Sequence, residues 1–145
     1  MNKNEIVRKL KEFGFELHEI PKSGYMFQYE DLAVLYMSEE GDDNFVRFAV
    51  PNIYDVTEEN KPYLLDMANE TNVTIKYGKV CIYGDYVWAC AEHHCYGNEE
   101  LEALIGLNLS LLKAMVSHFN RLVEGGGAEH DEEVNANEES EVPYE

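Results

Sequence analysis

The stretch WACAEHHCYG, residues 88–97, contains the side chains of this sequence that are best suited to chemistry. Within it, four residues that bind metal ions or transfer protons follow one another: Glu92, His93, His94 and Cys95. Side chains on a β-strand alternate between its two faces, so the two histidines would point in opposite directions. Glu92 with His94, or His93 with Cys95, would lie about 7 Å apart on one face. Zinc needs three or four ligands, so the sequence predicts no metal site and no bound cofactor.

A nucleophilic cysteine is the second chemical possibility at this strand end. The thiolate is the reactive form, and a neighbouring cation or a helix N-terminus stabilises it. Cys95 lies just before a predicted helix start at Asn98, which favours a reactive thiol slightly. The neighbouring carboxylates of Glu92, Glu99 and Glu100 would instead raise the pKa of that thiol. We therefore expect no catalytic residue, and a metal- or thiol-dependent enzyme remains the alternative hypothesis.

The elements that must position these residues follow from hydrophobic periodicity. Apolar residues recur at helical spacing in three segments and alternate in the segments between them. Between Tyr77 and Val80 the alternation changes parity, which predicts a β-bulge at Gly78-Lys79, with a tight turn as the alternative. The predicted elements are a helix over 4–13, strands over 24–30, 32–37 and 44–50, a helix ending near Asn69, strands over 73–83 and 86–95, and a helix over 99–123.

This order predicts an α+β fold with a five-stranded antiparallel sheet. Consecutive strands joined by short turns are typical of antiparallel sheets. The order is α-β-β-β-α-β-β-α, and we expect the helices to lie mainly on one face of the sheet. A single domain over residues 1–124 is expected, followed by an acidic tail over 125–145 that is too poor in large apolar groups to fold.

Charge and composition narrow the classes of partner. The net charge is -18, and the sequence has no cluster of Lys and Arg, so we expect neither a nucleic acid nor a membrane as partner. The N-terminus lacks the pattern of a signal peptide, and three cysteines are not a disulfide framework. The expected location is therefore the cytoplasm.

The last predicted helix carries an apolar face wider than one contact with a sheet usually needs. A first stripe is interrupted by Asn108, and a second stripe beside it includes Leu104, Leu107 and Leu111. A lone Asn in such a stripe can fix the register of a helix pair. The sequence thus predicts a self-association surface made of Leu104, Leu107, Asn108 and Leu111. Burial of the whole helix on its own sheet, with Asn108 bonded to a backbone group, is an equally open interpretation.

Aromatic side chains supply a third functional hypothesis, a small-ligand-binding domain. Ten tyrosines occur in the chain, and several fall on predicted strands. A ligand could bind an aromatic sheet face that includes Tyr25, Phe27, Tyr77 and Trp88.

The order of elements and several local segments resemble the YbjN family, whose members share the fold of type III secretion chaperones. The segments are NEIVRKLKEFGF, FVRFAVPN, LLDMANETNVTIKYGKVCIYGDYVWACAE and the closing helix, and the match covers residues 4–123. In that family a helix ends in an Asn-x-x-Asn step before a long hairpin, and Asn69 and Asn72 occupy those places. The resemblance implies a five-stranded antiparallel sheet, a dimer, binding to other proteins and no catalytic residues.

The leading hypothesis is a non-catalytic, dimeric domain that binds a protein partner, in a chaperone-like or regulatory role. Secretion chaperones hold a segment of a cargo protein, and many of them are acidic, as this chain is. Nothing in the sequence identifies the cargo or a secretion system.

Overall fold

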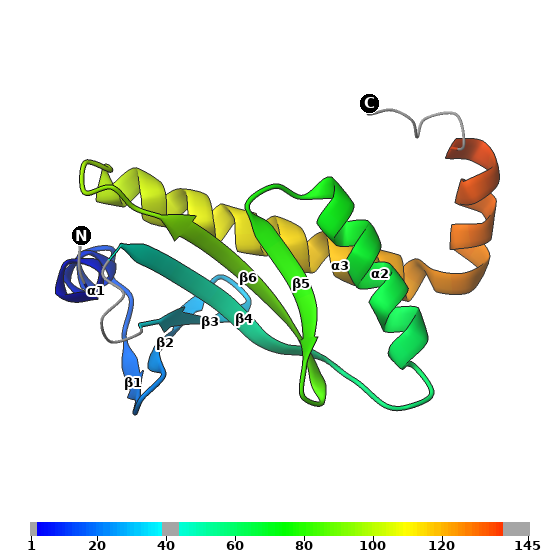
Figure 1. Cartoon of the computed structure of the whole chain (residues 1–145), viewed down its shortest axis with the longest axis horizontal. Coiled ribbons are helices and arrows are strands. Elements are labelled where there is room, and N and C mark those ends of the chain that lie inside the picture. The colour runs from blue at the N-terminus through cyan, green and yellow to red at the C-terminus, as the bar shows by residue number, and fades with distance from the viewer. Residues whose placement is uncertain (1–2, 39–43, 138–145) are drawn as a thin grey trace.

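Among the residues that the structure describes, six strands form one antiparallel sheet in the order β1-β2-β3-β4-β6-β5, and three helices accompany it (Figure 1). The computed structural model describes residues 3–38 and 44–137. The elements are α1 (Lys3–Glu12), β1 (His18–Ile20), β2 (Gly24–Tyr29), β3 (Leu32–Met37), β4 (Phe45–Asp55), α2 (Lys61–Thr74), β5 (Gly78–Tyr83), β6 (Tyr86–His94) and α3 (Leu101–Asn137).

The α+β class and the antiparallel sheet are confirmed, with one strand more than the sequence predicts. The additional strand, β1, has three residues and pairs with β2, with His18 opposite Met26. All three residues of β1 are exposed, so the strand lacks the alternation that reveals a half-buried strand.

The segment between α2 and β5 differs from the prediction. The alternation from Val73 to Tyr77 is not a strand, because α2 continues to Thr74 and β5 begins only at Gly78. Tyr77 takes a positive φ of 66°, and its side chain is 72% exposed. Val73 is 71% exposed, so its apolar side chain does not contribute to the core. The predicted bulge at Gly78-Lys79 is therefore wrong.

The irregularity in the sheet lies instead in β4. Its register with β6 shifts between Val50 and Tyr54, and Asn52 takes a positive φ of 55°. The strand therefore passes Pro51, where the sequence predicts its end, and continues to Asp55. A bulge of this kind tolerates a proline because the ladder is already interrupted there.

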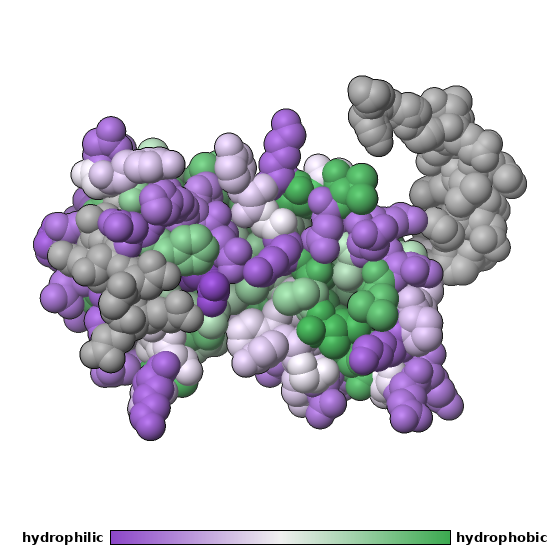
Figure 2. All heavy atoms as spheres, viewed as in Figure 1, coloured by the Kyte–Doolittle hydropathy of each residue, from purple (hydrophilic) through white to green (hydrophobic). Residues whose placement is uncertain are grey.

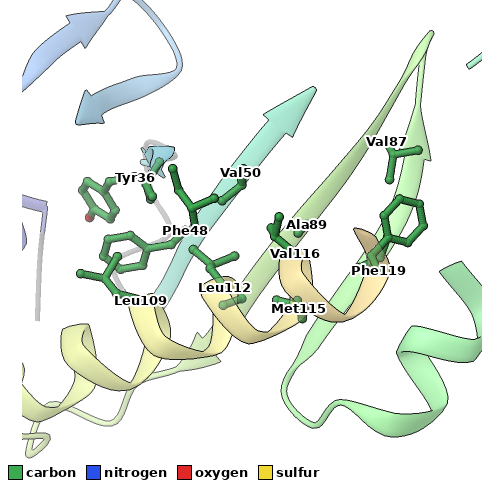
Figure 3. Close-up of a cluster of buried hydrophobic side chains, with 14 of the residues drawn as sticks. Tyr36, Phe48, Val50, Val87, Ala89, Leu109, Leu112, Met115, Val116 and Phe119 are labelled. Atoms are coloured by element: carbon green, nitrogen blue, oxygen red, sulfur yellow. The ribbon is translucent and has the colours of Figure 1, made fainter. Parts of the chain in front are cut away.

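The core lies between one face of the sheet and the helices, as predicted (Figure 3). Phe48 of β4 stands at its centre, opposite Tyr36 of β3 and Ala91 of β6 in the strand register. Each large side chain buried in this way stabilises the fold by about 1.5–3 kcal/mol. From α3, the side chains that pack on this face are Leu109, Leu112, Met115, Val116 and Phe119.

The packing of α3 on the sheet explains why residue 78 is a glycine. A Cβ at this position would lie 2.6 Å from Sδ of Met115 and 3.2 Å from the carbonyl oxygen of Cys90. Met115 is fully buried, so it has little room to move away. Glycine thus lets α3 approach the first residue of β5 closely.

An ion pair ties α3 to the turn between β2 and β3. Nζ of Lys113 lies 2.9 Å from Oε1 of Glu30 and 2.8 Å from Oδ1 of Asp31. These contacts raise the pKa of Lys113 and lower the pKa of Asp31. The side chains are exposed, so salt weakens their attraction.

The helix α3 extends past the position where the sequence predicts its end. The expected boundary at Glu124 falls inside α3, which continues through the three glycines 125–127 to Asn137. In Figure 1 the ribbon changes direction in its orange part, where these glycines allow a bend. Of the tail predicted to be disordered, residues 138–145 lie outside the described residues.

Asn72, near the end of α2, completes the hydrogen bonding at the free edge of β5. Its Nδ2 donates to the carbonyl oxygen of Val80 at 2.9 Å, and its Oδ1 accepts from the amide of Val80 at 2.7 Å. Because β5 is the last strand of the sheet, these two backbone groups have no neighbouring strand to pair with. The side chain of Asn72 thus takes the place of a further strand at this point.

We expect Asn72→Ala to destabilise the protein by about 1–3 kcal/mol, because it leaves a buried backbone donor and acceptor of Val80 without partners. Urea unfolding followed by circular dichroism measures this change. Asn69→Ala is the matched control, since Asn69 is exposed on the same helix and should change the free energy of unfolding by less than about 0.5 kcal/mol. Equal losses in the two variants would contradict this role of Asn72.

Candidate functional site

Glu92 lies on the face of the sheet that the helices leave open. Its Oε2 is 2.8 Å from Nε of Arg47 on β4 and 3.3 Å from Nζ of Lys79 on β5. Arg47 is also its partner in the strand register, so the carboxylate connects three neighbouring strands. Its proximity to two cations makes Glu92 a structural ion-pair residue.

His93 points to the opposite face, toward the helices, because it follows Glu92 on the strand. Its ring stacks on Tyr77 with centroids 5.3 Å apart and an angle of 24° between the planes. Its Nε2 is buried and has no hydrogen-bond partner among the described residues. Burial lowers the pKa of His93.

His94 and Cys95 are also separated. His94 packs edge-on against Tyr96, with ring centroids 4.7 Å apart, and lies opposite Phe45 in the strand register. Cys95 is 1% exposed, and its amide donates to the carbonyl oxygen of Asn44 at 2.7 Å. Burial, followed by the charge of Glu99, raises the pKa of the Cys95 thiol. These conditions oppose the formation of a thiolate.

The four adjacent residues therefore do not converge, and the two histidines point apart as the sequence predicts. Among the side chains that the structure describes, no three of His, Cys, Asp or Glu lie close enough together to hold a metal ion. The other two thiols lie on the open face of the sheet, where Cys90 is 7% exposed and Cys81 is half-buried. Burial raises the pKa of Cys90 to about 11.

The four aromatic residues considered for a ligand site do not share one surface. Tyr25 and Phe27 lie on the face that packs on the helices, and Phe27 is only 3% exposed. Trp88 lies on the open face, against Tyr83 at a centroid distance of 5.1 Å. Tyr77 stands in the turn before β5. The predicted aromatic platform is thus wrong.

The predicted self-association residues occupy three different environments on α3. Asn108 is fully buried, and its Nδ2 donates to the carbonyl oxygen of Leu104 at 2.8 Å. It therefore belongs to the interior of the domain and not to a surface, a correction to the sequence-based set. Leu104 and Leu111 are half-buried beside the core, and Leu107 is 54% exposed.

One exposed side of α3, around Leu107, contains no Asp, Glu, Lys or Arg over four turns, and the charged residue within these turns, Lys113, is paired with Glu30 and Asp31. Every residue of α3 that is exposed between Ala103 and Ser117 is small or apolar: Ala103, Gly106, Leu107, Ser110, Ala114 and Ser117. We call these six residues the neutral face of α3. A neutral helix face is unusual in a chain with a net charge of -18, and small side chains let another backbone approach closely. Of these small residues, the apolar periodicity of the sequence includes Ala114, whereas Gly106, Ser110 and Ser117 add nothing to it.

No helix in the described part of the chain is long and apolar enough to cross a membrane.

We expect the protein to become less stable as the pH falls below 6.5, in part because of His93. Its folded-state pKa lies below the usual 6.5, so its contribution to stability is complete above pH 6.5 and is lost as the pH falls through the folded pKa. His93→Gln should reduce this pH dependence, as measured by urea unfolding between pH 7.5 and 5. An NMR titration checks the premise, and a His93 pKa of 6.5 or higher in the folded protein would contradict it. His118→Gln is the control, because it should leave the titration of His93 unchanged.

Comparison with known proteins identifies solved structures with a similar fold. No family model and no curated protein matches the chain. The crystal structure of YbjN from E. coli, described as "a putative transcription regulator", is similar at a TM-score of 0.63 and 11% identity, over 95% of this chain and 94% of that chain. A structure of an uncharacterized protein from Methanothermobacter thermautotrophicus is similar at a TM-score of 0.57 and 14% identity, over 86% of this chain and 99% of that one. The chain therefore has the α+β fold of YbjN.

Proposed function

We propose that this protein is a non-catalytic, homodimeric domain that binds other proteins in a chaperone-like or regulatory role. The observation that supports it best is the neutral face of α3. Two molecules of charge -18 repel each other, so they associate most easily where neither presents a carboxylate. The neutral face is such a place, with Leu107 at its centre.

The arrangement of the proposed dimer follows from the side chains of α3. In a two-fold symmetric pair, each copy presents the same patch, so Leu107 packs on α3 of the partner near its own counterpart. The half-buried side chains of Leu104 and Leu111 flank Leu107 and widen the apolar contact. Alanine, serine and glycine around them allow the two helix axes to come within about 8–10 Å.

The positions of the reactive side chains are consistent with a binding role. Glu92 is held by two cations, His93 stacks on Tyr77, and Cys95 is buried, so each has a packing or pairing role in the domain. A binding protein needs surfaces with unsatisfied contacts and not a cluster of activated groups.

We expect the wild-type protein to be a dimer and the double variant Leu107→Glu, Leu111→Glu to be a monomer, since two carboxylates per copy would face each other across the contact. Light scattering coupled to size exclusion measures the mass. Leu107→Glu alone should weaken the dimer at least about tenfold, which corresponds to about 1.4 kcal/mol.

Ile20→Glu is a matched control, because Ile20 is exposed on β1 and lies outside α3. It should leave the dimer intact. Circular dichroism must show that the Leu111 substitution preserves the fold. A wild-type protein that is monomeric at high concentration would overturn the proposed dimer.

The metal content of the protein tests the alternative of a metal enzyme. Protein purified without an affinity tag should contain less than about 0.1 zinc or iron per chain, because a zinc site needs three or four ligands in one place. Elemental analysis measures this ratio. Stoichiometric zinc or iron that is lost in His93→Gln or Cys95→Ser would favour the enzyme instead.

A further inference from the structure

The outer surface of α2 carries two aliphatic side chains that its own domain does not cover. Leu65 and Val73 lie in one row with the polar Asn69 between them, at every fourth residue, and all three are exposed. Leu65 is 48% exposed and Val73 is 71% exposed, although both are aliphatic. Residues four apart lie above one another on a helix, so this row extends for about 12 Å.

Two carboxylates border this row. Asp66 follows Leu65 and Glu70 follows Asn69, and both acidic residues are exposed. Neither forms an ion pair with any described residue within 4 Å. The only basic residue in the sequence of α2 is Lys61, at its first position. Figure 2 shows hydrophobic residues gathered where α2 and β5 lie in Figure 1, with hydrophilic residues along their border.

We infer that the outer surface of α2 binds a basic amphipathic helix of a partner protein. The inference rests on the proposed protein-binding role and adds the chemistry of the partner. Apolar side chains of the partner pack on Leu65 and Val73, and its Lys or Arg residues pair with Asp66 and Glu70. Anchors at a spacing of four residues are typical of helix-to-helix recognition.

Charge distinguishes this partner from a second copy of the chain. Two α2 helices packed face to face would bring Asp66 and Glu70 of each copy together, and like charges at an interface are costly. A basic helix removes that repulsion, and the net charge of -18 attracts it over long distances. The neutral face of α3 and the acidic surface of α2 therefore suit different partners.

A synthetic helical peptide tests the inference with the full-length protein. The probe is a fluorescein-labelled peptide of about 15 residues with leucine at positions i, i+4 and i+8 and lysine on both sides of that row. The matched probe has glutamate in place of every lysine. Fluorescence anisotropy measures binding at low salt and at 0.5 M salt. We expect only the lysine peptide to bind, and salt should weaken its binding.

Two pairs of variants separate specific docking from general attraction to an acidic protein. Asp66→Asn with Glu70→Gln should weaken binding of the lysine peptide about tenfold, whereas Glu16→Gln with Glu19→Gln removes the same charge near β1 and should change it less than about twofold. Leu65→Ser with Val73→Ser should also weaken binding about tenfold, and Leu107→Ser should not.

Equal losses in the two charge-neutralised variants would overturn the inference, because they would show unspecific attraction. So would unchanged binding by the Leu65→Ser, Val73→Ser variant. A third contrary result is dissociation of the dimer in that same variant, which would assign α2 to contacts between copies. The proposed dimer through α3 is measured separately by mass, so either proposal can fail without the other.

Discussion

The packing of α3 on a single face of the sheet is the constraint on which the other features depend. Leu112, Met115 and Phe119 are completely buried between the helix and strands β4, β5 and β6. This contact fixes the rotation of α3 about its axis, and therefore also determines which residues it exposes. Asn108 faces inward because it lies in the same stripe, and its Nδ2 donates to the carbonyl oxygen of Leu104 on its own helix. The neutral face consists of the residues of α3 that this packing leaves exposed.

The helices cover only one face of the sheet, so neighbouring residues of β6 point into different surroundings. This explains why Glu92, His93, His94 and Cys95 do not form a catalytic site. Along β6 each step of one residue changes the face, so Glu92 meets cations on the open side while His93 meets Tyr77 on the helical side. A catalytic cluster would need residues from a second element to meet one of these groups. Near Glu92 that element is β4, and it supplies Arg47, whose Nε lies 2.8 Å from the carboxylate and occupies it in an ion pair.

The sequence predicts long periodic segments well and short or exposed ones poorly. The helical stripes of α1 and α3 are strong because their apolar side chains pack into the core, which includes Ile6, Leu10, Leu112 and Phe119. The spacing of Val73, Ile75 and Tyr77 is that of a half-buried strand. However, Val73 and Tyr77 are exposed, so burial does not stabilise a strand at these positions. Asn72 ties α2 to β5 through two hydrogen bonds to a residue eight positions later, and no periodicity contains that information.

The surface proposed for self-association is difficult to predict from the sequence for a related reason. Small residues such as Ala103, Ser110 and Ala114 occur equally in cores and on surfaces, so their exposure follows only from the packing of α3. The width of the apolar face is visible in the sequence, but Leu104 and Leu111 turn out to be half-buried on its flanks.

Because salt screens distant charges, the surfaces of α3 and α2 would favour different partners. At physiological salt a charge is felt over about 8 Å, so what matters at a contact is the local charge and not the total of -18. Over four turns of α3 the charged side chain is Lys113, which is already paired with Glu30 and Asp31, so a second acidic copy would meet little repulsion there. On α2 the carboxylates of Asp66 and Glu70, which form no ion pair with the described residues, lie within one turn of each other, where they would disfavour the same copy and favour a cation. Under both proposals, one acidic chain would discriminate between itself and a basic partner through the placement of very few residues.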